Sequence, residues 1–200
     1  MKQSIRLFNF KGTPVSLSLW FLLIFSITTW SYGVCIFISL LVHELAHAWV
    51  ANLKGYRVYS VHVGLLSGSV VIQSDINERD SVLITAAGPL SNLLLAAIGY
   101  TQMMLVPGIY YLGEFVILNT LLFIFNILPI YPMDGGQILK DLLILKMDNR
   151  SRANKIALFV SLITALLLLI FSLITMNFIM ALFSGYFFYL SLKGLRPLNI

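Results

Sequence analysis

The sequence predicts an all-α polytopic membrane protein with about six transmembrane helices and a short membrane-associated β-hairpin after the second helix. Hydrophobic residues make up 59% of the 200 residues and charged residues 10%, whereas ordinary soluble domains carry roughly 25% charged residues. The mean hydropathy is +0.92. No repeat, low-complexity tract or flexible linker interrupts the chain, so we expect a single domain over residues 1–200.

Six apolar stretches account for the expected helices, because about 20 apolar residues cross the hydrocarbon core of a bilayer. The turns near Ser31 and Asn177 are very short, so each should join two helices in a tight hairpin. The six stretches cover residues 14–30, 33–51, 82–106, 113–131, 156–176 and 177–192.

The segment 56–72 has the features of a β-hairpin. It is rich in β-branched residues, partly alternating, and split by Gly64 and Gly68. We expect it to lie at the inner leaflet, where a free strand edge would pair with an unwound substrate by strand addition. A purely structural hairpin that packs over the third span is the alternative interpretation.

All lysines and arginines fall in four segments that this topology places on one side of the membrane. They are Lys2, Arg6 and Lys11; Lys54, Arg57 and Arg79; Lys140, Lys146, Arg150, Arg152 and Lys155; and Lys193 and Arg196. Because cytoplasmic loops carry an excess of lysine and arginine, we expect a multi-pass protein of the cell membrane with both termini in the cytoplasm. Charges dispersed in this way exclude a nucleic-acid patch and favour contact with anionic lipid.

The second span contains His43, Glu44 and His47, although the chain has only three histidines and three glutamates. Ionisable groups are costly in hydrocarbon and usually mark a functional site. On a helix, residues i and i+4 share a face, so both imidazoles should point the same way with the carboxylate beside them. This is the arrangement of two zinc ligands and a general base. Because this span runs inward and ends near Asn52, we expect the site to lie near the cytoplasmic end and to be open to the cytoplasm.

A catalytic zinc generally takes a third protein ligand, and Asp134 is the ionisable residue at a comparable depth. Pro129 and Pro132 should unwind the chain at the end of the fourth span. Gly135 and Gly136 then allow a sharp return that directs Asp134 to the metal. We therefore expect one Zn²⁺ per chain.

Three motifs together resemble those of the site-2 protease family of intramembrane zinc metalloproteases. They are HExxH at His43–His47, GPxxN at Gly88–Asn92 and NxxPxxPxDG at Asn126–Gly135. The resemblance covers essentially the whole chain and implies that both histidines and the aspartate bind zinc while the glutamate acts on the attacking water. The PDZ domain and the C-terminal nucleotide-sensing domain of many relatives do not fit here, so we expect a minimal form.

This resemblance implies an endopeptidase that cleaves membrane-tethered proteins in or near their transmembrane segments, in a bacterium or archaeon. Asn92 is a candidate catalytic donor to the developing oxyanion and a candidate substrate ligand. Asn126 is a second candidate substrate ligand. The alternative for both amides is that they cap backbone groups freed by the prolines. The sequence identifies no regulatory partner or oligomeric state.

Three other functions are compatible with parts of the pattern. A transporter or ion pathway would use the His, Glu and Asp cluster for coordination, but no inverted repeat is evident. A membrane-anchored zincin that cleaves soluble substrates would need a longer loop. A catalytically inactive scaffold would not need the complete set of catalytic residue types.

Overall fold

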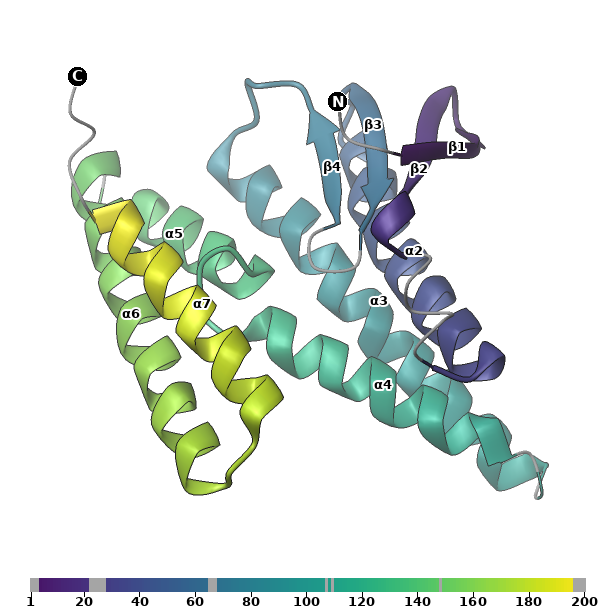
Figure 1. Cartoon of the computed structure of the whole chain (residues 1–200). Helices are drawn as coiled ribbons and strands as arrows, with labels where there is room; N and C mark the ends of the chain where they lie inside the picture. The colour runs from purple at the N-terminus through teal and green to yellow at the C-terminus, as the bar shows by residue number, and fades with distance from the viewer. Residues whose placement is uncertain are drawn as a thin grey trace. The chain divides into compact units, whose positions relative to one another are not determined.

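The computed structural model describes residues 4–21, 28–64, 68–106, 108, 110–147 and 149–195 (Figure 1). Contacts divide the chain into two compact units. The first unit comprises Met1–Ile76 and Ala87–Ile124, and the second comprises Asn77–Ala86 and Phe125–Ile200.

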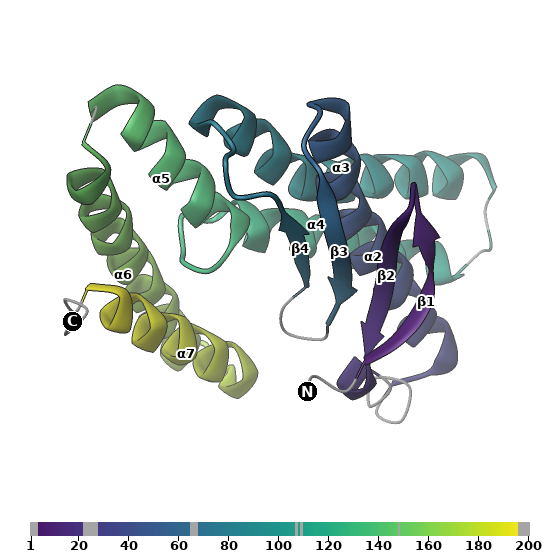
Figure 2. The ribbon, with the colours of Figure 1, turned by 90° about the horizontal axis from the view of Figure 1, so that it is seen from above.

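A four-stranded sheet forms the N-terminal part of the first unit, in the order β1-β2-β3-β4 (Figure 2). β1 pairs antiparallel with β2, β2 pairs parallel with β3, and β3 pairs antiparallel with β4. Lys11 and Gly12, both with positive φ, form the tight turn between the first two strands. The strands are β1 (Ser4–Phe10), β2 (Thr13–Ser18), β3 (Val58–Val63) and β4 (Ser69–Ile72).

The predicted hairpin at 56–72 is confirmed as β3 and β4, but the prediction of a membrane helix from residue 14 is wrong for residues 14–21. Those residues form β2 and the short 3-10 helix η1 (Leu19–Phe21). Val15 and Leu17 alternate with serines in the sequence, which is the period of a strand, and the buried Ser16 donates its hydroxyl to Val61 O of β3. Residues 22–27 of the predicted span lie outside the described residues.

The sheet packs against the first long helix of this unit, α2 (Trp30–Leu53). Leu17, Phe21 and Val63 form a buried apolar cluster against one face of α2. α2 ends in a Schellman-type turn, in which Gly55 has φ of +84° and Tyr56 N–H donates to Ala51 O. The other helices that contribute to this unit are α3 (Glu78–Leu105), from Ala87 onward, and α4 (Tyr110–Ile127), up to Ile124.

The second unit consists of the first turns of α3 together with three further helices. α5 packs against α6, and α6 packs against α7 along most of its length (Figure 1). Ser161 and Ser191 join α6 to α7 through a 2.7 Å hydrogen bond between their hydroxyls. The helices are α5 (Asp134–Met147), α6 (Arg150–Ile174) and α7 (Phe178–Leu195).

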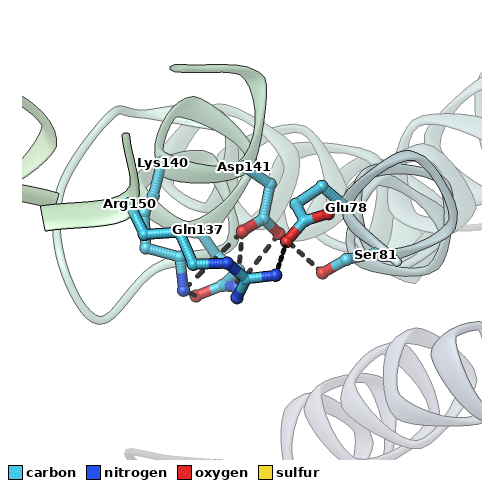
Figure 3. Close-up of polar contacts among 6 residues, drawn as sticks. All are labelled: Glu78, Ser81, Gln137, Lys140, Asp141 and Arg150. Atoms are coloured by element: carbon cyan, nitrogen blue, oxygen red, sulfur yellow. Dashed lines mark hydrogen bonds and ion pairs between the residues drawn. The ribbon is translucent and has the colours of Figure 1, made fainter. Parts of the chain in front are cut away.

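A polar cluster around the buried Asp141 ties the beginning of α3 to α5 and α6 (Figure 3). The Asp141 carboxylate is buried and accepts hydrogen bonds from Ser81 Oγ at 2.6 Å and from Gln137 Nε2 at 3.0 Å. Glu78 and Arg150 form an ion pair beside it. Residues 134–147 lie between the fourth and fifth predicted spans and form helix α5, in which the buried Asp141 is paired inside the protein.

Four helices, α2, α3, α6 and α7, are long and apolar enough to cross a membrane, and residues Tyr111–Ile127 form a shorter apolar helix. The protein is therefore a multi-pass membrane protein that is mostly helical, with a small sheet. α4 ends at Ile127, before Pro129, which confirms that the chain unwinds there. The first of the six predicted helices is not formed over 14–21, and a sixth membrane crossing, the membrane position of the hairpin and the orientation remain predictions.

Candidate metal centre

The two histidines of the HExxH motif lie on one face of α2, as their spacing predicts. Their Nε2 atoms are 3.2 Å apart, and the ring planes are inclined at 84°. Two nitrogens bound tetrahedrally at about 2.05 Å from one zinc ion would be about 3.3 Å apart. His43 and His47 therefore have the spacing of two ligands of a single zinc ion, and both are buried.

Gly88 of α3 lies directly beside the two Nε2 atoms. A Cβ atom added at this position would be 2.3 Å from His47 Nε2 and 2.6 Å from His43 Nε2. Both distances are far shorter than the van der Waals contact of about 3.5 Å, and the shorter one is within about 0.3 Å of a zinc–nitrogen bond of about 2.0–2.1 Å. The absence of a side chain at Gly88 therefore leaves open the space that a metal ion bound to both histidines would occupy.

Glu44 follows His43 on α2 and is also buried. Gly68, which immediately precedes β4, approaches its carboxylate so closely that an added Cβ atom would be 1.7 Å from Glu44 Oε1. The backbone at the start of β4 therefore lies against the carboxylate. This proximity brings one end of the sheet to the metal centre within the first unit.

Asn92 holds His43 in place through its other ring nitrogen. Asn92 Oδ1 lies 2.6 Å from His43 Nδ1. Because a carboxamide oxygen can only accept, the proton of the neutral imidazole is on Nδ1, and the lone pair of Nε2 is available to a metal. Asn92 Nδ2 donates to Asn119 Oδ1 at 3.0 Å and to Ser39 O at 3.3 Å.

Both amide hydrogens of Asn92 are thus used inside the protein, and its side chain is fully buried. These contacts differ from the predicted donation to a substrate or an oxyanion. They support a positioning role for Asn92.

Asn119 of α4 and Ser39 of α2 complete this network, although neither residue is among those predicted from the sequence. Asn119 Nδ2 donates to Ser39 Oγ and to Phe115 O, both at 2.9 Å, and Ser39 Oγ donates to Cys35 O at 2.8 Å. Asn119 and Ser39 have no exposed surface. The spacing of Ser39 four residues before His43, on the same helical face, was the available signal.

Asp134 and Asn126 belong to the second unit, on either side of the turn between α4 and α5. Asp134 is the first residue of α5, and Asn126 lies in the last turn of α4. Gly135 and Gly136 lie in α5 without positive φ. Added Cβ atoms would be 2.2 Å from Ile127 O at Gly135 and 2.7 Å from Ile130 O at Gly136. These glycines therefore permit close packing of the helix start against the turn. The sequence suggested instead that they were needed for backbone freedom.

The turn is also attached to α6. Tyr131 N–H donates to Ser161 Oγ at 2.7 Å, and Met133 N–H donates to Ile130 O at 2.7 Å. The residues between Pro129 and Asp134 are thereby held by hydrogen bonds within the second unit.

Comparisons with known proteins agree with these motifs. The model of peptidase family M50 matches residues 31–115 and 102–171. The chain belongs to peptidase family M50. A zinc metalloprotease of Methanocaldococcus jannaschii is 30% identical over 94% of the chain and 60% of its own length. A putative zinc metalloprotease of Synechocystis is 28% identical over 78% of the chain and 48% of its own length.

The chain thus spans about half to three-fifths of the length of these curated relatives. Among solved structures, the site-2 protease of Methanocaldococcus jannaschii is similar, with a TM-score of 0.72 and 26% identity over 98% of this chain and 97% of that chain. Zinc is the cofactor of the family members with these names. The spacing of His43 and His47 and the open space at Gly88 fit that metal.

Proposed function

We propose that the protein is an intramembrane zinc metalloendopeptidase, formed by a single domain over residues 1–200. It would hydrolyse peptide bonds in or near transmembrane segments of membrane-tethered proteins. The observation that carries the proposal is the pair of buried Nε2 atoms, 3.2 Å apart, with Glu44 beside them on a helix apolar enough to span a membrane. No observation on the described residues favours the alternative of a transporter.

Asp134 is the proposed third zinc ligand, with His43 and His47. A catalytic zinc generally has three protein ligands and one open position, and two histidines alone do not complete such a set. The NxxPxxPxDG motif and the start of a helix at Asp134 support this choice. When bound, zinc would supply a Lewis acid that polarises the scissile carbonyl and lowers the pKa of water to about 7.

Glu44 is the proposed general base. Its carboxylate would accept a proton from the attacking water as the water oxygen bonds to the carbonyl carbon. The same carboxylate would then give that proton to the amine nitrogen as the carbon–nitrogen bond breaks. Asn126 is the proposed donor to the substrate backbone, and Asn92 is assigned to positioning His43, because its own hydrogens are engaged.

The substrate must be unwound before cleavage, because a helix encloses its own peptide bonds. β4 is the proposed template: among the described residues it pairs only with β3, and it begins immediately after Gly68, which lies against Glu44. An extended segment added to the free edge of β4 would run past the general base. Proline substitutions along β4 that left cleavage unchanged would count against this template.

The proposed orientation places both termini and the entrance to the site on the cytoplasmic side of a bacterial or archaeal cell membrane. Its support is the distribution of all 13 lysines and arginines over four segments. Labelling of single cysteines in intact cells and in inverted vesicles tests this orientation.

Zinc content tests the proposed function without a known substrate. Purified wild-type protein should contain about one zinc per chain, and Asp134→Ala should lose it. Glu44→Gln should retain zinc but fail to cleave transmembrane peptides in proteoliposomes. Zinc retained by Asp134→Ala would remove Asp134 from the ligand set, and cleavage by Glu44→Gln at the wild-type rate would refute the mechanism.

A further inference from the structure

The second unit contains a hollow of about 430 Å³ among α5, α6 and α7. This volume lies within the range of about 300–1,000 Å³ that is typical of small-molecule sites. Its polar lining comes from Tyr131, Gln137, Lys140, Asn154 and Lys193. Its apolar lining comes from Ala157, Leu158 and Leu190, with two glycines, Gly136 and Gly194.

The hollow lies at the charged end of the hairpin formed by α6 and α7. Asn154 is near the beginning of α6, and Lys193 is in the last turn of α7. Residues 156–192 contain no charged side chain. Because charged side chains are costly in hydrocarbon, this end of the hairpin belongs at the level of the lipid headgroups, and the remainder of α6 and α7 belongs below it.

The charges around the hollow leave one positive charge without a partner. Lys140 Nζ donates to Gln137 Oε1 at 2.9 Å and lies 3.7 Å from Asp141 Oδ1 (Figure 3). Asp141 therefore offsets the charge of Lys140. Lys193 is exposed and makes no ion pair among the described residues. A ligand with one negative charge would neutralise the charge of Lys193.

The helices below the hollow present apolar side chains that the protein itself does not cover. Phe159 and Ile163 on α6, and Tyr186 and Tyr189 on α7, are all exposed. Leu158 and Leu190, which line the hollow, belong to the same two helices. A ligand that fits both the basic hollow and the exposed apolar faces of α6 and α7 has an anionic head and long apolar chains.

We propose that this hollow binds the headgroup of an anionic phospholipid. Lys193 and Lys140 contact the phosphate, Asn154 donates to it, and the acyl chains lie along the exposed faces of α6 and α7. Basic pockets between transmembrane helices at a membrane surface bind anionic headgroups in this way. The lipid would also contact Tyr131 and Gly136, on either side of Asp134.

The test is equilibrium binding to the full-length protein, delipidated in a neutral detergent, with phosphatidylglycerol and phosphatidylcholine of matched chains as probes. The variants are Lys193→Gln, Lys193→Arg and the double variant Lys140→Gln/Lys193→Gln. Lys155→Gln is the matched control, because this exposed lysine lies at the same end of α6 but does not line the hollow. If the double variant fails to fold, the comparison of Lys193→Gln with Lys193→Arg decides the test.

Wild-type protein, Lys193→Arg and Lys155→Gln should bind phosphatidylglycerol equally well and in preference to phosphatidylcholine. A lysine near anionic lipid contributes about 1 kcal/mol, so Lys193→Gln should bind about fivefold more weakly. The double variant should bind more weakly still, but by less than a second factor of about five, because Asp141 already offsets the charge of Lys140. Unchanged affinity in Lys193→Gln, or equal binding of both lipids, would overturn the proposal. Displacement of phosphatidylglycerol by equimolar glycerol phosphate would instead indicate a site for a free anion. The readout does not involve catalysis, so it is independent of the proposed protease activity.

Discussion

The substitution Gly88→Ala should abolish zinc binding while the protein remains folded. The added methyl carbon would be 2.3 Å from His47 Nε2 and 2.6 Å from His43 Nε2. Favourable contact requires about 3.5 Å, so each imidazole must move by about 1 Å. Metal–ligand distances tolerate only about 0.2 Å. The required movement is therefore about five times the tolerance, and it affects both histidines at once.

The expected loss of zinc affinity in Gly88→Ala can be judged from the effect of milder substitutions near metal ligands. Loss of an outer partner of a ligand typically lowers metal affinity about 10–100-fold, so displacement of two ligands should lower it by more than about 100-fold. The fold should survive, because alanine is favoured over glycine in a helix by about 1 kcal/mol and this gain offsets part of the overlap.

Zinc content and competition with a chelator, both on detergent-purified protein, measure the effect directly. Gly185→Ala on α7 is the control, because no atom lies within 4 Å of its added Cβ. Both variants should show the wild-type helical signal, and only Gly88→Ala should lose zinc. If Gly88→Ala bound about one zinc per chain with unchanged affinity, the two Nε2 atoms would not converge on a metal beside Gly88.

Three further substitutions test other parts of the site. Gly68→Ala should keep zinc but lose cleavage, since the new methyl group would be 1.7 Å from Glu44 Oε1 and must displace the general base; a wild-type cleavage rate would contradict this. Asn119→Leu should weaken zinc binding about 10–100-fold in chelator competition, because the support of Asn92 is lost, and wild-type affinity would show that Asn92 needs no such support. Ser161→Ala leaves Tyr131 N–H without its acceptor and should lower the free energy of unfolding by about 1–3 kcal/mol in a denaturant titration; an unchanged midpoint would mean that water replaces the hydroxyl.

The helices that the sequence predicted correctly are those with long apolar runs. The second, third, fifth and sixth predicted spans correspond to α2, α3, α6 and α7 within a few residues, because continuous apolar character is the direct requirement of a membrane environment. Residues 14–21 were wrongly predicted to be helical because they begin a long stretch that is apolar on average. The two serines that alternate with Val15 and Leu17 are too few to change that average. α5 was not among the predicted helices because it is too short and too charged for a membrane span, whereas in the structure its Asp141 is paired internally.

The candidate site shows the same division. The two histidines and the glutamate could be predicted from the sequence, since ionisable residues are rare within an apolar helix. Asn119 and Ser39 were not, because a single small polar residue is compatible with any transmembrane helix, and only the folded chain shows that they meet. The role of Asn92 likewise depended on the direction of its amide, which no sequence pattern contains.

The GPxxN and HExxH motifs place contacting residues on two neighbouring helices, α3 and α2. Gly88 and Asn92 are four residues apart on α3, as His43 and His47 are on α2, so each pair lies on one face of its helix. Gly88 leaves space at the Nε2 atoms, and Asn92 accepts from Nδ1 of His43, so the two residues serve the two nitrogens of one ring. A side chain at the first position would fill the space for the metal, and an apolar residue at the second would release the ring. The spacing of Gly88 and Asn92 is therefore explained by the two nitrogens of His43, because Gly88 leaves space beside Nε2 and Asn92 accepts a hydrogen bond from Nδ1.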